Sequence, residues 1–168
     1  MSILQEILTH NEEFVAEKKY ERYITTKFPN KKMVILTCMD TRLLELLPQA
    51  LNLANGDVKI IKNAGAVVVH PLGSIMRSIL VAVYELKADE VLVIGHHDCG
   101  MSALNADDMM AKMKDRGITE EIISTIENTG VDLTSWLTGF SSVSESVEHS
   151  VGMIKSTHFC LLECLCMD

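Results

Sequence analysis

The stretch Met33-Val34-Ile35-Leu36-Thr37-Cys38-Met39-Asp40-Thr41-Arg42 decides the fold. Its first six residues are mainly apolar and rich in β-branched side chains, a pattern that predicts a strand buried on both faces. Residues 58–61 and 91–94 are also short apolar runs, and the second of them stops abruptly at Gly95. We therefore expect three strands in this part of the chain.

Helices are expected between these strands. Apolar residues recur at helical spacing over residues 43–53 and 72–86. The order strand, helix, strand, helix, strand is typical of a parallel sheet with helices on its faces. With 168 residues, the chain is long enough to bury a substantial core. We expect a single α/β domain over residues 1–168, with a central, mainly parallel sheet of about four strands flanked by helices.

Helices are also expected on both sides of this central region. Residues 1–30 predict a helical arm, with Ser2 as its N-cap and an interrupted apolar stripe behind it. The stripe consists of Ile3, Leu4, Ile7, Leu8, Phe14 and Val15. Such a helix needs a surface to cover, either on its own domain or on a partner. After residue 102 the sequence predicts helices over 107–116, from 119 onward and over 142–155.

Charge and hydropathy exclude several classes of function. A formal net charge of −8 without clustered Lys and Arg argues against nucleic acid as a partner. The longest apolar stretch, residues 79–83, is about a quarter of the roughly 20 residues that a membrane-spanning helix needs. Acidic and amide residues interrupt the N-terminal segment where a signal peptide requires an apolar core. We expect a cytoplasmic protein that binds neither nucleic acid nor membrane.

Two clusters of chemically active residues follow predicted strands. The first is Cys38-x-Asp40-x-Arg42, and the second is Gly95-His96-His97-Asp98-Cys99-Gly100. In open parallel sheets, ligand sites form outside the carboxyl ends of the strands. The two clusters therefore converge if the first and third predicted strands are neighbours.

The cysteines and histidine of these clusters suggest a metal site. The chain has five cysteines, which in a reducing cytoplasm are more often metal ligands, catalytic thiols or buried residues than disulfide partners. Two thiolates and one imidazole, from Cys38, Cys99 and His96, suit zinc and leave a fourth tetrahedral position for water or Asp40. Three protein ligands with an open fourth position are typical of catalytic zinc sites. The residues alone also allow an alternative without a metal. Cys38 would then be a buried core cysteine, Cys99 a loop thiol and His96 the cap of a turn.

A third motif makes the pattern specific to one family. Lys62-Asn63-Ala64-Gly65 lies between the two clusters. The three motifs follow one another in an order and spacing that resemble the β-carbonic anhydrase family, particularly its short prokaryotic members. The resemblance extends from about residue 33 to residue 101.

The resemblance implies ligands, a cofactor and a reaction. Cys38, His96 and Cys99 would bind Zn²⁺, and Asp40 and Arg42 would be the family's paired acid and base. The reaction would be the reversible hydration of CO2 to bicarbonate and a proton, through zinc-bound hydroxide. The resemblance also implies a homodimer, or an oligomer built from dimers, whose N-terminal helix embraces its partner.

Elementary chemistry gives Asp40 and Arg42 a role beside such a zinc ion. Asp40 can accept the hydroxide's proton in a hydrogen bond and aim its lone pair, while Arg42 keeps Asp40 ionised and fixed. In a closed state that the resemblance also suggests, Asp40 displaces water and binds zinc, so that the pair acts as a pH-dependent gate. The competing interpretation is an ordinary surface ion pair worth at most about 1 kcal/mol.

The remaining residues of the motifs have smaller roles. His97 is a candidate for proton transfer because an imidazole titrates near neutrality, although packing at the rim of the site is the alternative. Gly95 and Gly100 would let the backbone approach the metal and the substrate, which makes Gly100 a candidate for substrate binding. Asp98 would cap the turn or hold a neighbouring loop, and Gly65 would be structural.

Two other functions fit the same residues. The family scaffold and metal site also serve the hydrolysis of carbon disulfide or carbonyl sulfide. A non-catalytic zinc-binding regulator would instead use Asp40 to keep the metal closed. The intact pair of Asp40 and Arg42 favours an enzyme over such a regulator.

The end of the chain departs from the family pattern. Residues 159–168 are apolar and cysteine-rich, where relatives continue into a Pro-rich turn and a closing strand. We therefore expect the closing strand to be missing, and with it the usual edge of the sheet. For this atypical tail we favour burial or poor order over a second metal site at Cys160, Cys164 and Cys166.

Overall fold

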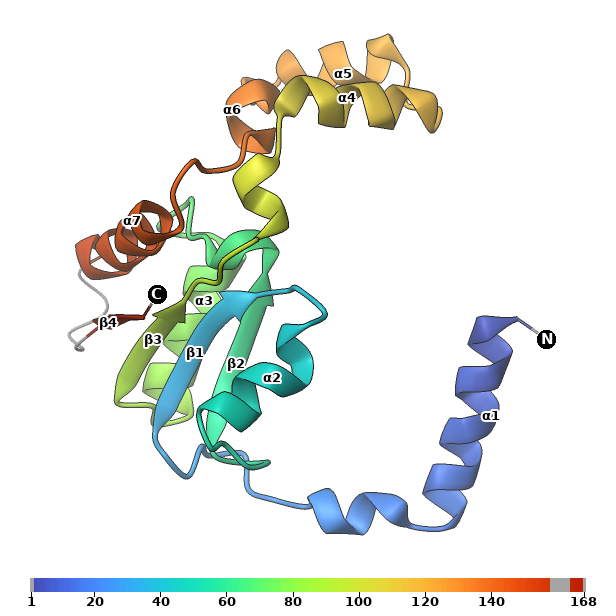
Figure 1. The fold of residues 1–168 in the computed structure, drawn as a ribbon, viewed down its shortest axis with the longest axis vertical. Helices are drawn as coiled ribbons and strands as arrows, with labels where there is room; N and C mark the ends of the chain where they lie inside the picture. The colour runs from blue at the N-terminus through green and yellow to red at the C-terminus, as the bar shows by residue number, and fades with distance from the viewer. Residues whose placement is uncertain (1, 158–163, 168) are drawn as a thin grey trace.

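A parallel β-sheet forms the centre of the structure (Figure 1). The computed structural model describes residues 2–157 and 164–167, the latter as backbone only. Within these residues four strands lie in the order β2-β1-β3-β4, and each strand runs parallel to its neighbours. The strands are β1 (Met33–Cys38), β2 (Val58–Asn63), β3 (Glu90–Ile94) and β4 (Cys164–Met167). The predicted α/β class and the three predicted strands are confirmed.

The strand β1 occupies the interior of the sheet because its side chains are apolar on both faces. Val34, Ile35 and Leu36 are completely buried, whereas β2 at the edge is mostly half-buried. At the carboxyl end of β1, the buried hydroxyl of Thr37 donates to the carbonyl of Ile94 in β3 at 3.2 Å. The strands β1 and β3 therefore end side by side, which is the condition for the two clusters to meet.

Helices cover both faces of the sheet, because successive side chains of a strand point to opposite faces. One face packs against α3 (Ser74–Leu80) and α7 (Val143–Ser156), and the other packs against α2 (Leu43–Ala50). The first core includes Val34, Leu36, Val91, Val93, Met76, Ile79, Val147, Val151 and Ile154. The second core includes Ile35, Leu92, Ile94, Leu43, Leu47, Cys38 and Cys99. Two of the candidate metal ligands thus belong to the second core.

The predicted helices form, with differences at their ends. The other helices are α1 (Ile3–Ala16), α4 (Ala106–Asp115), α5 (Glu120–Glu127) and α6 (Leu133–Leu137). The helix predicted over residues 72–86 begins at Ser74 and changes to π-helical geometry over Val81–Glu85. The helix predicted over 43–53 ends at Ala50, and Asn52 beyond it is left-handed with a φ of 51°. No helix of the described residues has the length and apolarity needed to cross a bilayer.

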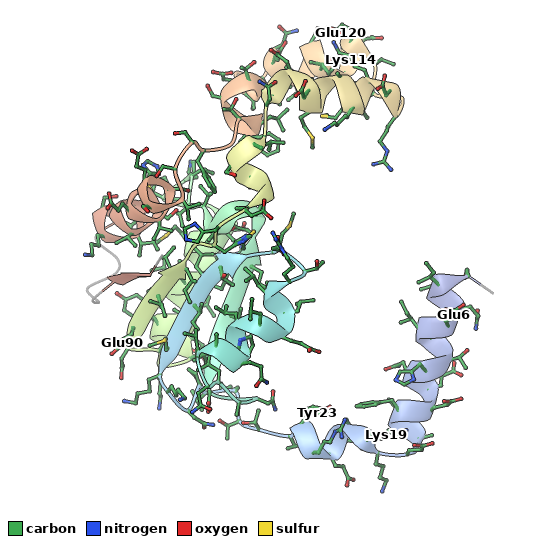
Figure 2. All side chains as sticks on the ribbon, in the orientation of Figure 1. Glu6, Lys19, Tyr23, Glu90, Lys114 and Glu120 are labelled. Carbon is green, nitrogen blue, oxygen red and sulfur yellow. The ribbon has the colours of Figure 1, made fainter. Side chains whose placement is uncertain are left out.

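The helix α1 stands apart from the sheet (Figure 1), and none of its residues is buried. Its cap is as predicted, since the Ser2 hydroxyl accepts a hydrogen bond from the N–H of Gln5 at 3.2 Å. Figure 2 shows α1, marked by Glu6, away from the side chains that surround the sheet. The apolar side chains of Ile3 and Leu4 are 76% and 65% exposed. The described part of the chain therefore leaves most of the predicted stripe uncovered, with Phe14 half-buried beside Tyr23.

The expectation that a closing strand is missing is wrong. Residues Cys164–Met167 form β4, which pairs with β3 from Val91 opposite Cys164 to Ile94 opposite Met167. An extended segment can pair there because the outer edge of β3 would otherwise present unpaired backbone N–H and C=O groups. Cys160 and the side chains of Cys164 and Cys166 lie outside the described residues, so the interpretations of the tail's side chains are not tested.

Gly95, directly after β3, lets α7 pack closely on the sheet. A Cβ atom here would lie 2.6 Å from Val143 Cγ1 and 2.9 Å from Val147 Cγ2. We expect Gly95→Ala to lower the free energy of unfolding by about 1–3 kcal/mol, the usual cost of overpacking. Urea denaturation measures this change. Gly100→Ala is the control, because a Cβ there meets nothing within 4 Å; equal losses in the two variants would contradict the explanation.

Candidate metal centre

The side chains of Cys38, His96 and Cys99 meet at the carboxyl ends of β1 and β3. Cys38 is the last residue of β1, whereas His96 and Cys99 lie in the turn that follows β3. One ligand atom from each residue lies within 4.8 Å of the other two. The adjacent placement of β1 and β3 therefore brings together the three residues that the sequence predicts as metal ligands.

The two sulfur atoms have the spacing of a tetrahedral zinc site. Cys38 Sγ and Cys99 Sγ are 3.8 Å apart. Two Zn–S bonds of about 2.3 Å at a tetrahedral angle also place their sulfur atoms about 3.8 Å apart. Both cysteines are buried and neither forms a disulfide. The pair therefore fits a single zinc ion.

The ring of His96 is oriented to bind a metal through Nε2. Its Nδ1 lies 2.8 Å from the carbonyl oxygen of His97, and we assign the ring proton to Nδ1 from this hydrogen bond. Among buried side-chain nitrogen and oxygen atoms of the described residues, His96 Nε2 is the one without a hydrogen-bond partner. Histidine ligands usually have this arrangement, with the second ring nitrogen held by a carbonyl or carboxylate. A metal ion would satisfy the remaining lone pair.

Backbone N–H groups contact both thiols, and burial affects the pKa of Cys99. Burial raises the pKa of Cys99; the N–H of Met101 opposes this shift, whereas the adjacent Cys38 sulfur adds to it. A bound divalent cation removes the proton of such a thiol outright. The N–H of Gly65 donates to Cys38 Sγ at 3.4 Å. The thiol pair is thus suited to hold a cation that stabilises its ionised form.

Arg42 holds both oxygens of Asp40 beside these three residues. Arg42 Nε donates to Asp40 Oδ1 at 3.0 Å and Nη2 donates to Oδ2 at 2.8 Å, while the backbone N–H of Arg42 donates to Oδ1 at 2.8 Å. The guanidinium hydrogen bonds, followed by the backbone one, hold the pKa of Asp40 well below its usual range. Asp40 Oδ2 lies 3.9 Å from His96 Nε2. The pair therefore lies against the candidate metal ligands.

Asp98 also binds Arg42, which lies in the neighbouring turn after β1. Arg42 Nη1 donates to Asp98 Oδ2 and Nη2 donates to the Asp98 carbonyl, both at 2.9 Å. Asp98 has a φ of 53°, which helps to turn its carbonyl toward the guanidinium. Arg42 thereby connects the turn after β1 with the turn after β3. Asp98 thus holds a neighbouring loop, one of its two predicted roles, although the spacing of the motif does not identify Arg42 as its partner.

Gly95, Gly100 and His97 complete the second cluster, and the sequence does not predict their surroundings. The backbone at Gly95 is approached by Val143 and Val147 of α7, and glycine is needed there for packing. Gly100 is exposed at the start of a 3₁₀ turn, Gly100–Ala103, and no steric contact requires a glycine there. The His97 side chain is exposed, and the contact of His97 with the site runs through its backbone carbonyl.

A cavity of about 990 Å³ lies next to the site but outside it. Its mainly apolar lining includes Asn63, Met101, Val131, Trp136, Phe140 and His149. Of these, Met101 and Phe140 also pack against the core that contains Cys38 and Cys99. None of the residues predicted for the metal site lines this cavity.

Comparison with known proteins places this arrangement in a family. The carbonic anhydrase family profile matches residues 33–160. Two Bacillus subtilis proteins, YvdA and YtiB, are provisionally named as carbonic anhydrases, and each is 63% identical to this chain. These alignments cover 93% and 92% of this chain, and 79% and 83% of the two relatives.

A solved structure agrees with the sequence comparison. The crystal structure of β-carbonic anhydrase isoform I from the protozoan Trichomonas vaginalis superposes with a TM-score of 0.86 at 30% sequence identity. The match covers 99% of this chain and 92% of that chain. The family profile, the two relatives and this fold agree with the motifs at the ends of β1 and β3. This chain belongs to the β-carbonic anhydrase family.

Proposed function

We propose that this chain is a zinc-dependent carbonic anhydrase that reversibly hydrates CO2 to bicarbonate and a proton. The observation that carries the proposal is the set of two sulfur atoms 3.8 Å apart with the unpartnered Nε2 of His96 beside them. When bound, zinc lowers the pKa of water so that hydroxide is available near neutral pH to attack CO2. Cys38, Cys99 and His96 would hold the ion.

Asp40 would act as a hydrogen-bond acceptor for the attacking oxygen. Because Arg42 keeps the pKa of Asp40 far below neutrality, Asp40 stays a carboxylate at working pH and accepts protons in hydrogen bonds without donating them. It would orient the nucleophile's lone pair toward the carbon of CO2. In a closed state with Asp40 as a fourth ligand, its hydrogen bonds to Arg42 would have to rearrange. The intact pair supports the catalytic arrangement.

A comparison of two substrates tests the proposed reaction. The protein is loaded with zinc, and CO2 hydration and carbon disulfide hydrolysis are measured on the same preparation. We expect turnover of CO2 to exceed that of carbon disulfide. Faster hydrolysis of carbon disulfide would support the alternative reaction, and bound zinc without turnover of either substrate would support a regulator.

We propose proton transfer by His97 as a separate step, since its exposed imidazole lies one residue from a ligand. If this holds, His97→Ala lowers turnover in dilute buffer, and added imidazole restores it. The substitution keeps the backbone carbonyl that orients His96, so zinc content should not change. Stopped-flow rates at several buffer concentrations measure the effect, and unaltered turnover in dilute buffer would exclude the shuttle.

We also propose that the backbone of Gly100 contacts the substrate.

We propose that the chain acts in the cytoplasm as a homodimer or an oligomer built from dimers, with residues 1–168 as one domain and residues 1–30 as an arm. The uncovered apolar stripe of α1 supports this assembly, because exposed apolar helix faces commonly mark interaction surfaces. A second copy would cover the stripe. Light scattering at micromolar concentration checks the assembly, and a monomeric mass would contradict it.

A further inference from the structure

A buried serine of α7 connects the core of the protein to the turn after β2. Ser150 is fully buried, and its hydroxyl is the hydrogen-bonding group that α7 presents to this turn. The hydroxyl donates to the carbonyl of Ala66 at 3.2 Å and accepts from the N–H of Val68 at 3.1 Å. Both backbone groups are therefore fixed from a helix more than eighty residues later in the chain.

The turn held by Ser150 has an unusual backbone. Gly65 and Ala66 have φ values of 78° and 57°, both in the left-handed region that L side chains rarely adopt. The side chain of Asn63 holds the same turn from its other side, donating to the Val67 carbonyl at 2.7 Å and accepting from the Val67 N–H at 3.1 Å. Glycine adopts such a φ readily, so the two polar side chains maintain a conformation that Ala66 alone disfavours.

This conformation directs one backbone group at a proposed metal ligand. The N–H of Gly65 donates to Cys38 Sγ at 3.4 Å, in a buried environment. A side chain does not fit at this position, because a Cβ on Gly65 would lie 2.9 Å from Phe140 Cε1. The contacts therefore run from the Ser150 hydroxyl through Ala66 and Gly65 to the sulfur atom.

We propose that Ser150 is a positioning residue of the metal site, and that it acts by holding the Gly65 N–H on the sulfur of Cys38. The inference rests on the zinc site proposed above. A hydrogen bond to a thiolate ligand withdraws electron density from the sulfur, and such contacts tune metal centres. Ser150 therefore sets how much charge Cys38 donates to the metal, although it touches neither the metal nor the substrate.

Cobalt substitution tests this role without relying on activity. Co²⁺ bound to thiolates gives a sulfur-to-cobalt charge-transfer band, whose energy depends on the electron density at sulfur. We expect this band to shift to longer wavelength in Ser150→Ala, because the thiolate loses part of its hydrogen bond. Val151→Ala is the matched control, since it removes buried side-chain volume from the next position of α7 and keeps both hydrogen bonds of Ser150 to the turn. Its band should stay in place.

The outcomes separate this inference from the proposed function. A wild-type protein that shows no charge-transfer band with Co²⁺ would overturn the thiolate metal site and this inference with it. A wild-type band that is unshifted in Ser150→Ala would overturn the role of Ser150 alone, and so would an equal shift in Val151→Ala. If Ser150→Ala does not fold, the position of the same band is measured in Ser150→Cys instead. This variant keeps a side chain of similar shape, and its thiol forms weaker hydrogen bonds than the hydroxyl.

Discussion

Cys38→Ser should no longer bind zinc stoichiometrically, and its CO2 turnover should fall by at least about 100-fold. A loss of this size lies at or beyond the upper end of the losses seen when residues that hydrogen-bond to metal ligands are removed. Serine keeps the shape of the side chain, but its hydroxyl stays protonated and is a poor zinc ligand. Removing one sulfur of the pair at 3.8 Å would leave only Cys99 and His96 as ligands. Zinc content by mass spectrometry and stopped-flow rates measure the two effects.

A neighbouring residue provides the control for this substitution. The side chain of Met39 is 64% exposed, and it follows Cys38 directly. Met39→Ala should therefore keep both zinc and turnover. Because Cys38 is buried in the second core, circular dichroism must first show that the serine variant is folded. A folded Cys38→Ser protein with wild-type zinc content would remove this residue from the ligand set.

Arg42→Gln should bind zinc normally and lose about 100-fold or more of its turnover, the range expected for a positioned catalytic group. Without the guanidinium, Asp40 loses the hydrogen bonds of Nε and Nη2 and keeps the one from the backbone N–H of residue 42 to Oδ1, so its pKa rises part of the way toward the ordinary value. Arg42 then no longer holds Oδ2 in place beside the metal ligands proposed here. Arg116→Gln is the control, because Arg116 is an exposed residue at the end of α4, a helix that lies away from the sheet in Figure 1.

The pH dependence of this pair has a defined sign. In the folded wild-type protein the pKa of Asp40 is lowered, so the pair contributes stability at every pH above the ordinary aspartate pKa of about 3.9. That contribution is lost only as the pH falls below this value. Turnover of the wild type should therefore show no inflection from Asp40 near neutrality. Equal turnover in Arg42→Gln and wild type would reduce the pair to an ordinary surface contact.

The sequence predicts most of the sheet because the signals for it are local. The apolar run Met33–Cys38 is a strand with the predicted bounds, and β3 differs from its prediction by one residue. The meeting of Cys38, His96 and Cys99 follows from these strands, since the carboxyl ends of neighbouring parallel strands lie at the same edge of the sheet. The prediction that the closing strand is missing is wrong for a related reason. Pairing with the edge of β3 depends on backbone groups, so the unusual sequence of Cys164–Met167 does not prevent it.

The contacts that support the proposed ligands could not be predicted. The His97 carbonyl on His96 and the Gly65 N–H on Cys38 are backbone groups, and every sequence contains such groups. The hydrogen bonds of Arg42 to Asp98 and of Ser150 to Ala66 join segments 56 and 84 residues apart. Only the folded chain brings these groups together, so residue type and spacing carry no signal for them.

Stopped-flow CO2 hydration by the zinc-loaded protein is the most direct test of the central claim. Rates are measured from about pH 6.5 to pH 9, at graded zinc content, with folded Cys38→Ser as the reference. The proposed site predicts a rate that rises in proportion to bound zinc and falls to the buffer background in the serine variant. A zinc-loaded wild-type protein that hydrates CO2 no faster than buffer, or a serine variant that matches it, would contradict the account.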